Sequence, residues 1–165
     1  MIIAHLPSGY IVGRLLTKAP LVVPAAVVGG IIPDIDMFWY YFIDQKTVHH
    51  HQYWVHIPAF WAVIAMCVLP IILICANRYR TAAFGFFIAV FLHLFLDTIA
   101  GNIMWLYPFS DHLTRLVVYP RHYGHWIFNS LFHWVFVLEI GICFVAAVFW
   151  FFREKDTGQT EQPDG

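Results

Sequence analysis

IPAFWAVIAMCVLPIILICA, residues 57–76, is an unbroken run of 20 residues without a charged side chain. An α-helix rises about 1.5 Å per residue, so a run of this length crosses the ~30 Å hydrocarbon layer of a bilayer. The composition agrees, because 61% of the 165 residues are hydrophobic and only 12% are charged. Soluble domains carry about 25% charged residues. The sequence therefore predicts an integral membrane protein.

Two further apolar runs predict additional long spans, over residues 81–107 and 126–152. The N-terminal third leaves two interpretations open, because residues 6–18 and 20–32 are short runs separated by the helix-breaking Ala19-Pro20. They form either a helical hairpin that dips partway into the bilayer or a single irregular span over residues 20–41. We predict an all-α, multi-pass transmembrane helical bundle over residues 1–152, followed by a disordered polar tail over residues 153–165.

The distribution of charge predicts the orientation of this bundle. Arg78 and Arg80 lie in one short turn, and Arg153 and Lys155 follow the last run. An excess of Lys and Arg marks cytoplasmic segments, so we predict a bacterial inner-membrane protein with a cytoplasmic C-terminus. The opposite loops carry Asp34, Asp36, Asp44 and Asp111, together with Lys46, Arg115 and Arg121. A formal net charge of −1 gives no reason to expect a nucleic-acid partner.

His93 and Asp97 interrupt the run over residues 81–107. Side chains four positions apart share one face of a helix, so an imidazole and a carboxylate can bind one ion there. The alternative is a neutral histidine and a protonated aspartate that bond to each other or to neighbouring groups. Ionisable side chains are costly inside a membrane and usually serve a function there. We therefore favour a metal site at this pair.

Other polar residues can reach the same end of the bundle. Of His49, His50 and His51, at most one or two can bind one ion, and His51 and His56 could both turn inward. The remaining candidates are His5, Asp34 and Asp36. Imidazoles and carboxylates together are typical ligands of zinc, manganese and iron.

His125, Asn129 and His133 lie at helical spacing along the last run. They are polar groups that connect packed helices, outer hydrogen-bonding partners of metal ligands, or part of a second metal site. Glu139 receives no assignment.

The ordered set of motifs resembles the bacterial membrane-bound metal-dependent hydrolase family. The matching stretches are His5, Gly30-Ile-Ile-Pro-Asp-Ile-Asp36, His51-Gln-Tyr-Trp-Val-His56 and His93-Leu-Phe-Leu-Asp97. That family is distantly similar to zinc-dependent phospholipases C and single-strand-specific zinc nucleases. The resemblance implies a zinc site, with manganese or iron as alternatives, and a catalytic Asp34. The implied ligands of the main site are Asp36 (or Asp34), one of His51 and His56, His93 and Asp97. His5 would approach a neighbouring metal. Gln52 and Val55 replace the family's usual Arg and Thr.

The sequence-based hypothesis is thus a membrane-embedded hydrolase in which a metal-activated water attacks a phosphoester, a phospholipid for example, at the outer membrane interface. Two other classes stay open. One is a membrane metal carrier or sensor without catalysis, which would use the same ligands. The other is a haem protein with two axial histidines such as His93 and His133. The oligomeric state is left open.

Overall fold

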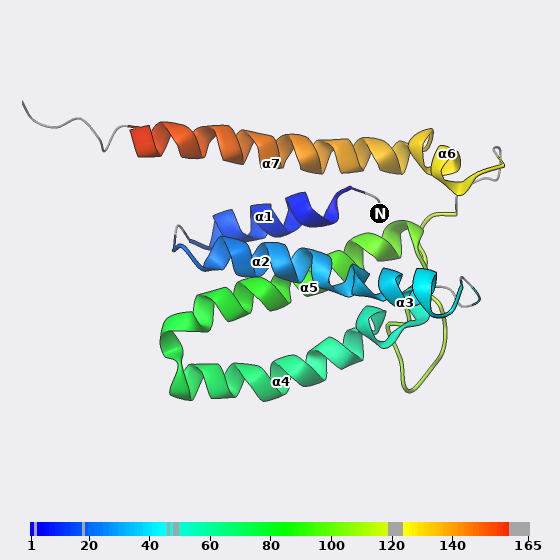
Figure 1. The fold of residues 1–165 in the computed structure, drawn as a ribbon, viewed down its shortest axis with the longest axis horizontal. Coiled ribbons are helices and arrows are strands. Elements are labelled where there is room, and N and C mark those ends of the chain that lie inside the picture. The colour runs from blue at the N-terminus through cyan, green and yellow to red at the C-terminus, as the bar shows by residue number, and fades with distance from the viewer. Residues whose placement is uncertain (2, 18, 46, 48–49, 119–123, 159–165) are drawn as a thin grey trace, which may run out of the picture.

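The computed structural model describes residues 1, 3–17, 19–45, 47, 50–118 and 124–158 (Figure 1). Its regular elements are helical, and within this part of the chain the only β-type pairing is an isolated antiparallel bridge between Ile103 and Thr114. The predicted all-α fold is confirmed. The longer helices are α1 (His5–Leu16), α2 (Val22–Ile31), α3 (Asp36–Phe42), α4 (Pro58–Cys75), α5 (Arg80–Ala100), α6 (Trp126–Leu131) and α7 (Trp134–Gly158).

Four segments are long and apolar enough to cross a membrane: Val22–Phe42, Pro58–Cys75, Asn77–Ala100 and Trp134–Phe152. The first of them combines α2, the 3-10 turn η1 (Ile32–Ile35) and α3. Helix α1 runs antiparallel to α2 (Figure 1). Its 12 residues reach about 18 Å, which is too short to span. The two interpretations of the N-terminal third therefore both hold in part, as a hairpin whose second arm continues into an irregular span.

Two predicted span boundaries are wrong. The run over residues 81–107 stays helical only to Ala100, because the chain becomes extended at Gly101 and turns back to pair Ile103 with Thr114. The run over residues 126–152 is interrupted between α6 and α7. The candidate span within α7 ends at Phe152, as predicted, and the helix itself continues to Gly158. Residues 159–165 of the predicted tail lie outside the described residues.

Glycine residues allow α1, α2 and α5 to pack closely against each other. A Cβ added at Gly9 of α1 would lie 2.6 Å from the carbonyl oxygen of Ala26 in α2. A Cβ added at Gly29 of α2 would collide with the backbone of Phe86 in α5. The bare glycine backbones are therefore what allows these three helices to approach each other.

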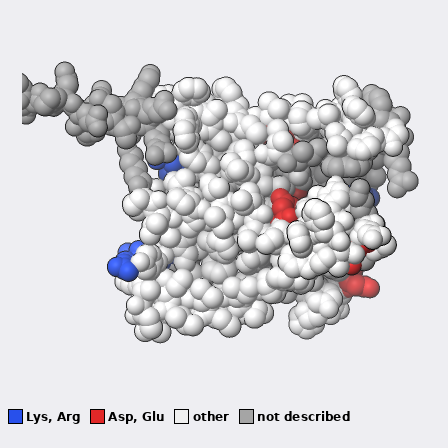
Figure 2. All heavy atoms as spheres, in the orientation of Figure 1, with Lys and Arg blue, Asp and Glu red and all other residues white. Residues whose placement is uncertain are grey.

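Basic and acidic side chains are concentrated at different ends of the bundle, although Arg115 lies at the acidic end, next to Thr114, which pairs with Ile103. The turn between α1 and α2 and the turn between α4 and α5 lie at the same end (Figure 1). Arg14, Arg78 and Arg80 belong to the helix ends that meet there. Acidic side chains gather in the opposite half (Figure 2). The candidate ligands lie in that acidic half.

Candidate metal centre

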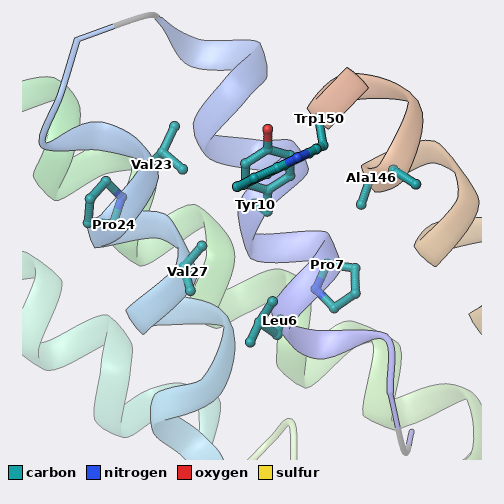
Figure 3. A pocket seen from close by; sticks show the side chains of 9 residues that line it. Leu6, Pro7, Tyr10, Val23, Pro24, Val27, Ala146 and Trp150 are labelled. Atoms are coloured by element: carbon teal, nitrogen blue, oxygen red, sulfur yellow. The ribbon is translucent and has the colours of Figure 1, made fainter. Parts of the chain in front are cut away.

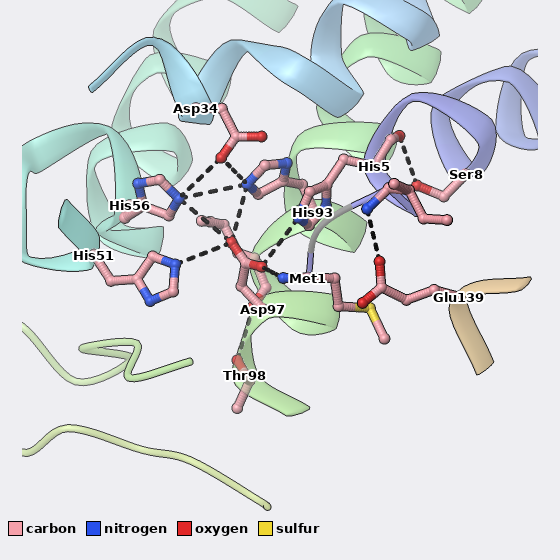
Figure 4. A network of polar contacts seen from close by, with 12 residues as sticks. Met1, His5, Ser8, Asp34, His51, His56, His93, Asp97, Thr98 and Glu139 are labelled. Carbon is pink, nitrogen blue, oxygen red and sulfur yellow. Dashed lines mark hydrogen bonds and ion pairs between the residues drawn. The ribbon is translucent and has the colours of Figure 1, made fainter. Parts of the chain in front are cut away.

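A cluster of imidazoles surrounds Asp97 inside the bundle (Figure 4). Asp97 is 1% exposed and extends from the last turn of α5. Six of the candidate side chains form this cluster, and each has a nitrogen or oxygen atom within 4 Å of such an atom in another of the six. The members are His5 of α1, Asp34 of η1, His51 of η2 (His50–Gln52), His56 of η3 (Trp54–His56), and His93 and Asp97 of α5.

Four imidazole nitrogens converge on the Asp97 carboxylate. The Nε2 atom of His5 lies 3.0 Å from Oδ1. The Nε2 atoms of His93, His56 and His51 lie 3.2, 3.4 and 3.5 Å from Oδ2. The Oδ2 atom is buried and faces these three nitrogens. This carboxylate oxygen is therefore the common neighbour of three imidazole nitrogens.

These separations fit a shared ion. Two ligands at ~2.0–2.1 Å from a tetrahedral zinc lie about 3.4 Å apart. The Nε2 atoms of His56 and His93 are 3.4 Å apart, and His93 Nε2 is 3.6 Å from Asp34 Oδ1. Two groups meet the spacing for an ion, one formed by His5, Asp34, His93 and Asp97, the other by His51, His56 and Asp97. Because both groups contain Asp97, its carboxylate can serve two adjacent positions.

The outer nitrogens of two ligands are held by hydrogen bonds. His93 Nδ1 donates to the carbonyl oxygen of Gly30 at 2.7 Å, and this fixes Nε2 as the atom that faces the cluster. His56 Nδ1 lies 2.6 Å from Asp36 Oδ2, so Asp36 orients His56 in the same way. Such partners set the tautomer and raise the basicity of a metal-binding histidine.

The two aspartates of Pro33-Asp-Ile-Asp36 occupy different positions around the cluster. The sequence favoured Asp36 over Asp34 as the metal ligand and gave Asp34 a catalytic role. In the structure, Asp36 lies behind His56, whereas Asp34 belongs to a ligand group and has a side chain 40% exposed. Asp34 is thus a candidate ligand whose side chain is accessible from outside the bundle.

Gly101 is a site residue that sequence reasoning missed. The His51 ring packs so closely against its backbone that an added Cβ would collide with the ring. The backbone N–H of Asn102 also donates to His51 Nδ1 at 3.3 Å. A signal was present in the sequence, because Gly101 follows Asp97 by one helical turn and ends the helix there.

The N-terminal segment was missed as well. The Met1 amino group donates to Asp97 Oδ1, and the Ile3 N–H donates to Glu139 Oε2 at 2.7 Å. Glu139 is fully buried on α7. Its role is therefore to connect α7 with the segment that leads into His5, and nothing in the sequence pattern linked these distant positions.

His125 and His133 act at helix starts. Nδ1 of His125 accepts a hydrogen bond from the Ile127 N–H, and Nδ1 of His133 accepts one from the Val135 N–H, both at 3.3 Å. Each histidine thus satisfies a free N–H in the first turn of α6 or α7. These two hydrogen bonds are local to α6 and α7, whereas the sequence predicted groups that connect packed helices or take part in a metal site. His49, Lys46 and Arg121 lie outside the described residues.

The two loop histidines have opposite pKa shifts. Burial lowers the pKa of His51. Burial also acts to lower the pKa of His56, but its hydrogen bonds with Asp36 and Asp97 raise it to about 9. Without metal, His56 is therefore protonated at neutral pH and holds a proton on the nitrogen that faces the cluster.

We expect metal affinity to rise with pH because an ion must displace this proton. The apparent affinity for zinc should increase about tenfold per pH unit and level off near the His56 pKa of about 9. Zinc titrations followed by tryptophan fluorescence at pH 6.5, 7.5 and 8.5 measure this slope. An affinity that is the same at all three pH values would contradict the assignment of His56.

Comparison with known proteins decides the family. The model of the YdjM inner membrane protein family matches residues 1–155. The chain belongs to the YdjM inner membrane protein family. No curated protein and no solved structure matches it.

The match corrects the resemblance inferred from the motifs. The resemblance to the membrane-bound metal-dependent hydrolase family is wrong, because the family model that matches is YdjM. The further similarity to zinc-dependent phospholipases C and zinc nucleases is wrong as well, since no match to those enzymes is found. A histidine and an aspartate one helical turn apart can bind an ion in any helix, so this spacing does not identify a family. Membership does confirm an inner-membrane protein with helices able to cross the bilayer.

Proposed function

We propose that the cluster around Asp97 is a divalent metal centre and that this YdjM protein is a membrane-embedded hydrolase. The observation that carries the proposal is the convergence of four imidazole nitrogens on one buried carboxylate, at separations of 3.0–3.5 Å. Asp34 completes the set, because its Oδ1 atom lies 3.6 Å from His93 Nε2 and 3.9 Å from His56 Nε2. Zinc suits this nitrogen- and oxygen-rich set best, with manganese or iron as the alternatives.

The arrangement of the ligands supports catalysis. A bound divalent ion would lower the pKa of a coordinated water toward neutrality and polarise a phosphoryl oxygen. Asp97, His56 and His93 are each at most 1% exposed, so they form the closed side of the site. Asp34, with its partly exposed carboxylate, can meet an incoming substrate and accept a proton. A phosphoester, whose oxygens are good ligands for such ions, is the substrate class that fits.

The depth of the site favours a substrate from the membrane surface. His93 lies 13 residues beyond Arg80, about 20 Å along α5 from the basic end of the bundle. Because Lys and Arg mark the cytoplasmic side, the site opens toward the outer side and the C-terminus is cytoplasmic. A phospholipid or another membrane-held phosphoester reaches the centre from there.

A metal carrier is less well supported. Passage across the membrane requires further ligands on the far side of the site. The α2 helix and the first 13 residues of α5, from Arg80 to Leu92, contain no carboxylate, imidazole or thiol. An ion held at Asp97 therefore finds no further ligands along these two helices. This absence favours a fixed catalytic or structural site over a transport route.

The test is hydrolysis by the protein in nanodiscs loaded with zinc or manganese. We expect metal-dependent release of p-nitrophenol from bis(p-nitrophenyl) phosphate, or of a soluble headgroup from phospholipid. Asp34→Asn should remove most of this activity, whereas Asp111→Asn, the same change at an exposed loop residue, should leave it intact. Absence of turnover with both substrates, in protein that holds metal, would rule out the hydrolase.

A further inference from the structure

A groove separate from the metal centre lies between α1, α2 and α7 (Figure 3). Its volume is about 460 Å³, within the ~300–1,000 Å³ range of small-molecule sites. Two of the three helices belong to candidate membrane spans, so the molecules that can reach the groove are lipids. Its lining residues are Leu6, Pro7, Tyr10, Val23, Pro24, Val27, Ala146, Ala147 and Trp150.

One polar group interrupts this apolar lining. Tyr10 is only 8% exposed, and its hydroxyl has no hydrogen-bond partner among the residues that the structure describes. In Figure 3 the hydroxyl extends toward the connection between α1 and α2. Buried hydroxyls normally have a partner, so this group calls for an acceptor that a bound molecule supplies.

A cation follows one turn later on the same helix. Arg14 is four residues beyond Tyr10, so both side chains project from one face of α1. The Nε atom of Arg14 is buried and, within the described part of the chain, also lacks a hydrogen-bond partner. Arg14 does not itself line the groove, and the helical spacing places it one turn beyond Tyr10, toward the basic end of the bundle. An apolar groove with a cation beyond one end has the polarity of a lipid with a negatively charged headgroup.

We propose that this groove binds an anionic glycerophospholipid from the leaflet at the basic end of the bundle. The phosphate accepts hydrogen bonds from Arg14, an ester oxygen accepts one from Tyr10, and one acyl chain lies against Pro7, Val27 and Ala146. The lipid fills the space between the α1–α2 hairpin and α7. This site is distinct from the metal centre and does not depend on the proposed hydrolase activity.

Native mass spectrometry of protein released from bilayers with equal phosphatidylglycerol and phosphatidylcholine tests the proposal. The wild type should retain one phosphatidylglycerol in preference to phosphatidylcholine. Arg14→Gln should lower this preference about tenfold or more, and the isosteric Tyr10→Phe should lower retention without a loss of fold. Arg78→Gln, at the same end but in the α4–α5 turn, is the matched control. Equal retention by Arg14→Gln and the wild type would overturn the proposal.

A substitution that fills the groove tests lipid binding independently of Arg14 and Tyr10. Val27→Phe places a ring in the groove, whereas Val63→Phe adds the same ring on the 54% exposed lipid-facing position of α4. Loss of bound phosphatidylglycerol in the first variant alone supports the site. If Val27→Phe instead keeps the lipid and loses phosphoester hydrolysis, the groove holds a substrate chain, and the proposal of an anionic lipid site is overturned.

Discussion

Asp97→Asn is expected to lower metal affinity by at least ~100-fold and to remove hydrolysis. Both ligand groups contain this carboxylate, so one substitution removes a charged ligand from each. Loss of an outer hydrogen-bonding partner costs ~10–100-fold in affinity, and loss of a shared ligand should cost more. Competition of the purified variant with a zinc chelator measures the change, with circular dichroism to confirm that the helices are retained.

Two further aspartate-to-asparagine variants are controls for the loss of metal affinity in Asp97→Asn. Asp111→Asn makes the same chemical change at an exposed loop position and should leave affinity unchanged. Asp36→Asn weakens only the partner of His56 Nδ1 and should fall between the two, at ~10–100-fold. A ranking in which Asp36→Asn is more damaging than Asp97→Asn would make Asp36 the direct ligand and contradict the arrangement described above.

Gly29→Ala is expected to destabilise the bundle more than any other single methyl added to α1 or α2. The added Cβ would collide with the carbonyl group and the Cα atom of Phe86, and a helix backbone cannot rotate away as a side chain can. Overpacking costs about 1–3 kcal/mol, and more when the backbone must move. Separation of α2 from α5 would also stretch the hydrogen bond between His93 and Gly30, so thermal unfolding and metal content should fall together.

Gly141→Ala is the control for this effect. A Cβ added at Gly141 of α7 meets no heavy atom within 4 Å, and alanine favours a helix by roughly 0.5–1 kcal/mol over glycine. Its unfolding temperature should therefore equal or exceed that of the wild type. If both alanine variants unfold like the wild type, close packing of α2 on α5 is not what holds this part of the fold.

The membrane fold could be predicted from the sequence because lipid imposes a simple rule on it. A spanning helix must be apolar over about 20 residues, and Pro58–Cys75 follows the run over residues 57–76 almost residue by residue. The rule fails where a helix ends for a local reason. Ala100 ends α5 seven residues early because Gly101 and the Ile103–Thr114 pairing turn the chain back, and hydropathy does not register this.

The residues of the cluster could also be predicted from the sequence. Imidazoles and carboxylates are rare in membrane helices, and those present pair with one another. Which aspartate faces the cluster could not be predicted. Asp34 and Asp36 are two residues apart, and the 3-10 geometry of η1 decides their directions. The roles of Gly101, Ile3 and Glu139 depend on contacts between distant segments, so no local pattern contained them.

The measurement that tests the metal centre most directly is elemental analysis of the detergent-purified protein beside His93→Ala and His133→Ala. His93 lies in the cluster, whereas His133 caps the start of α7. We expect about one or two equivalents of zinc, manganese or iron in the wild type and in His133→Ala, with a clear loss in His93→Ala. Protein that remains free of metal even after reconstitution with added ions would contradict the account and leave the cluster as polar packing between helices.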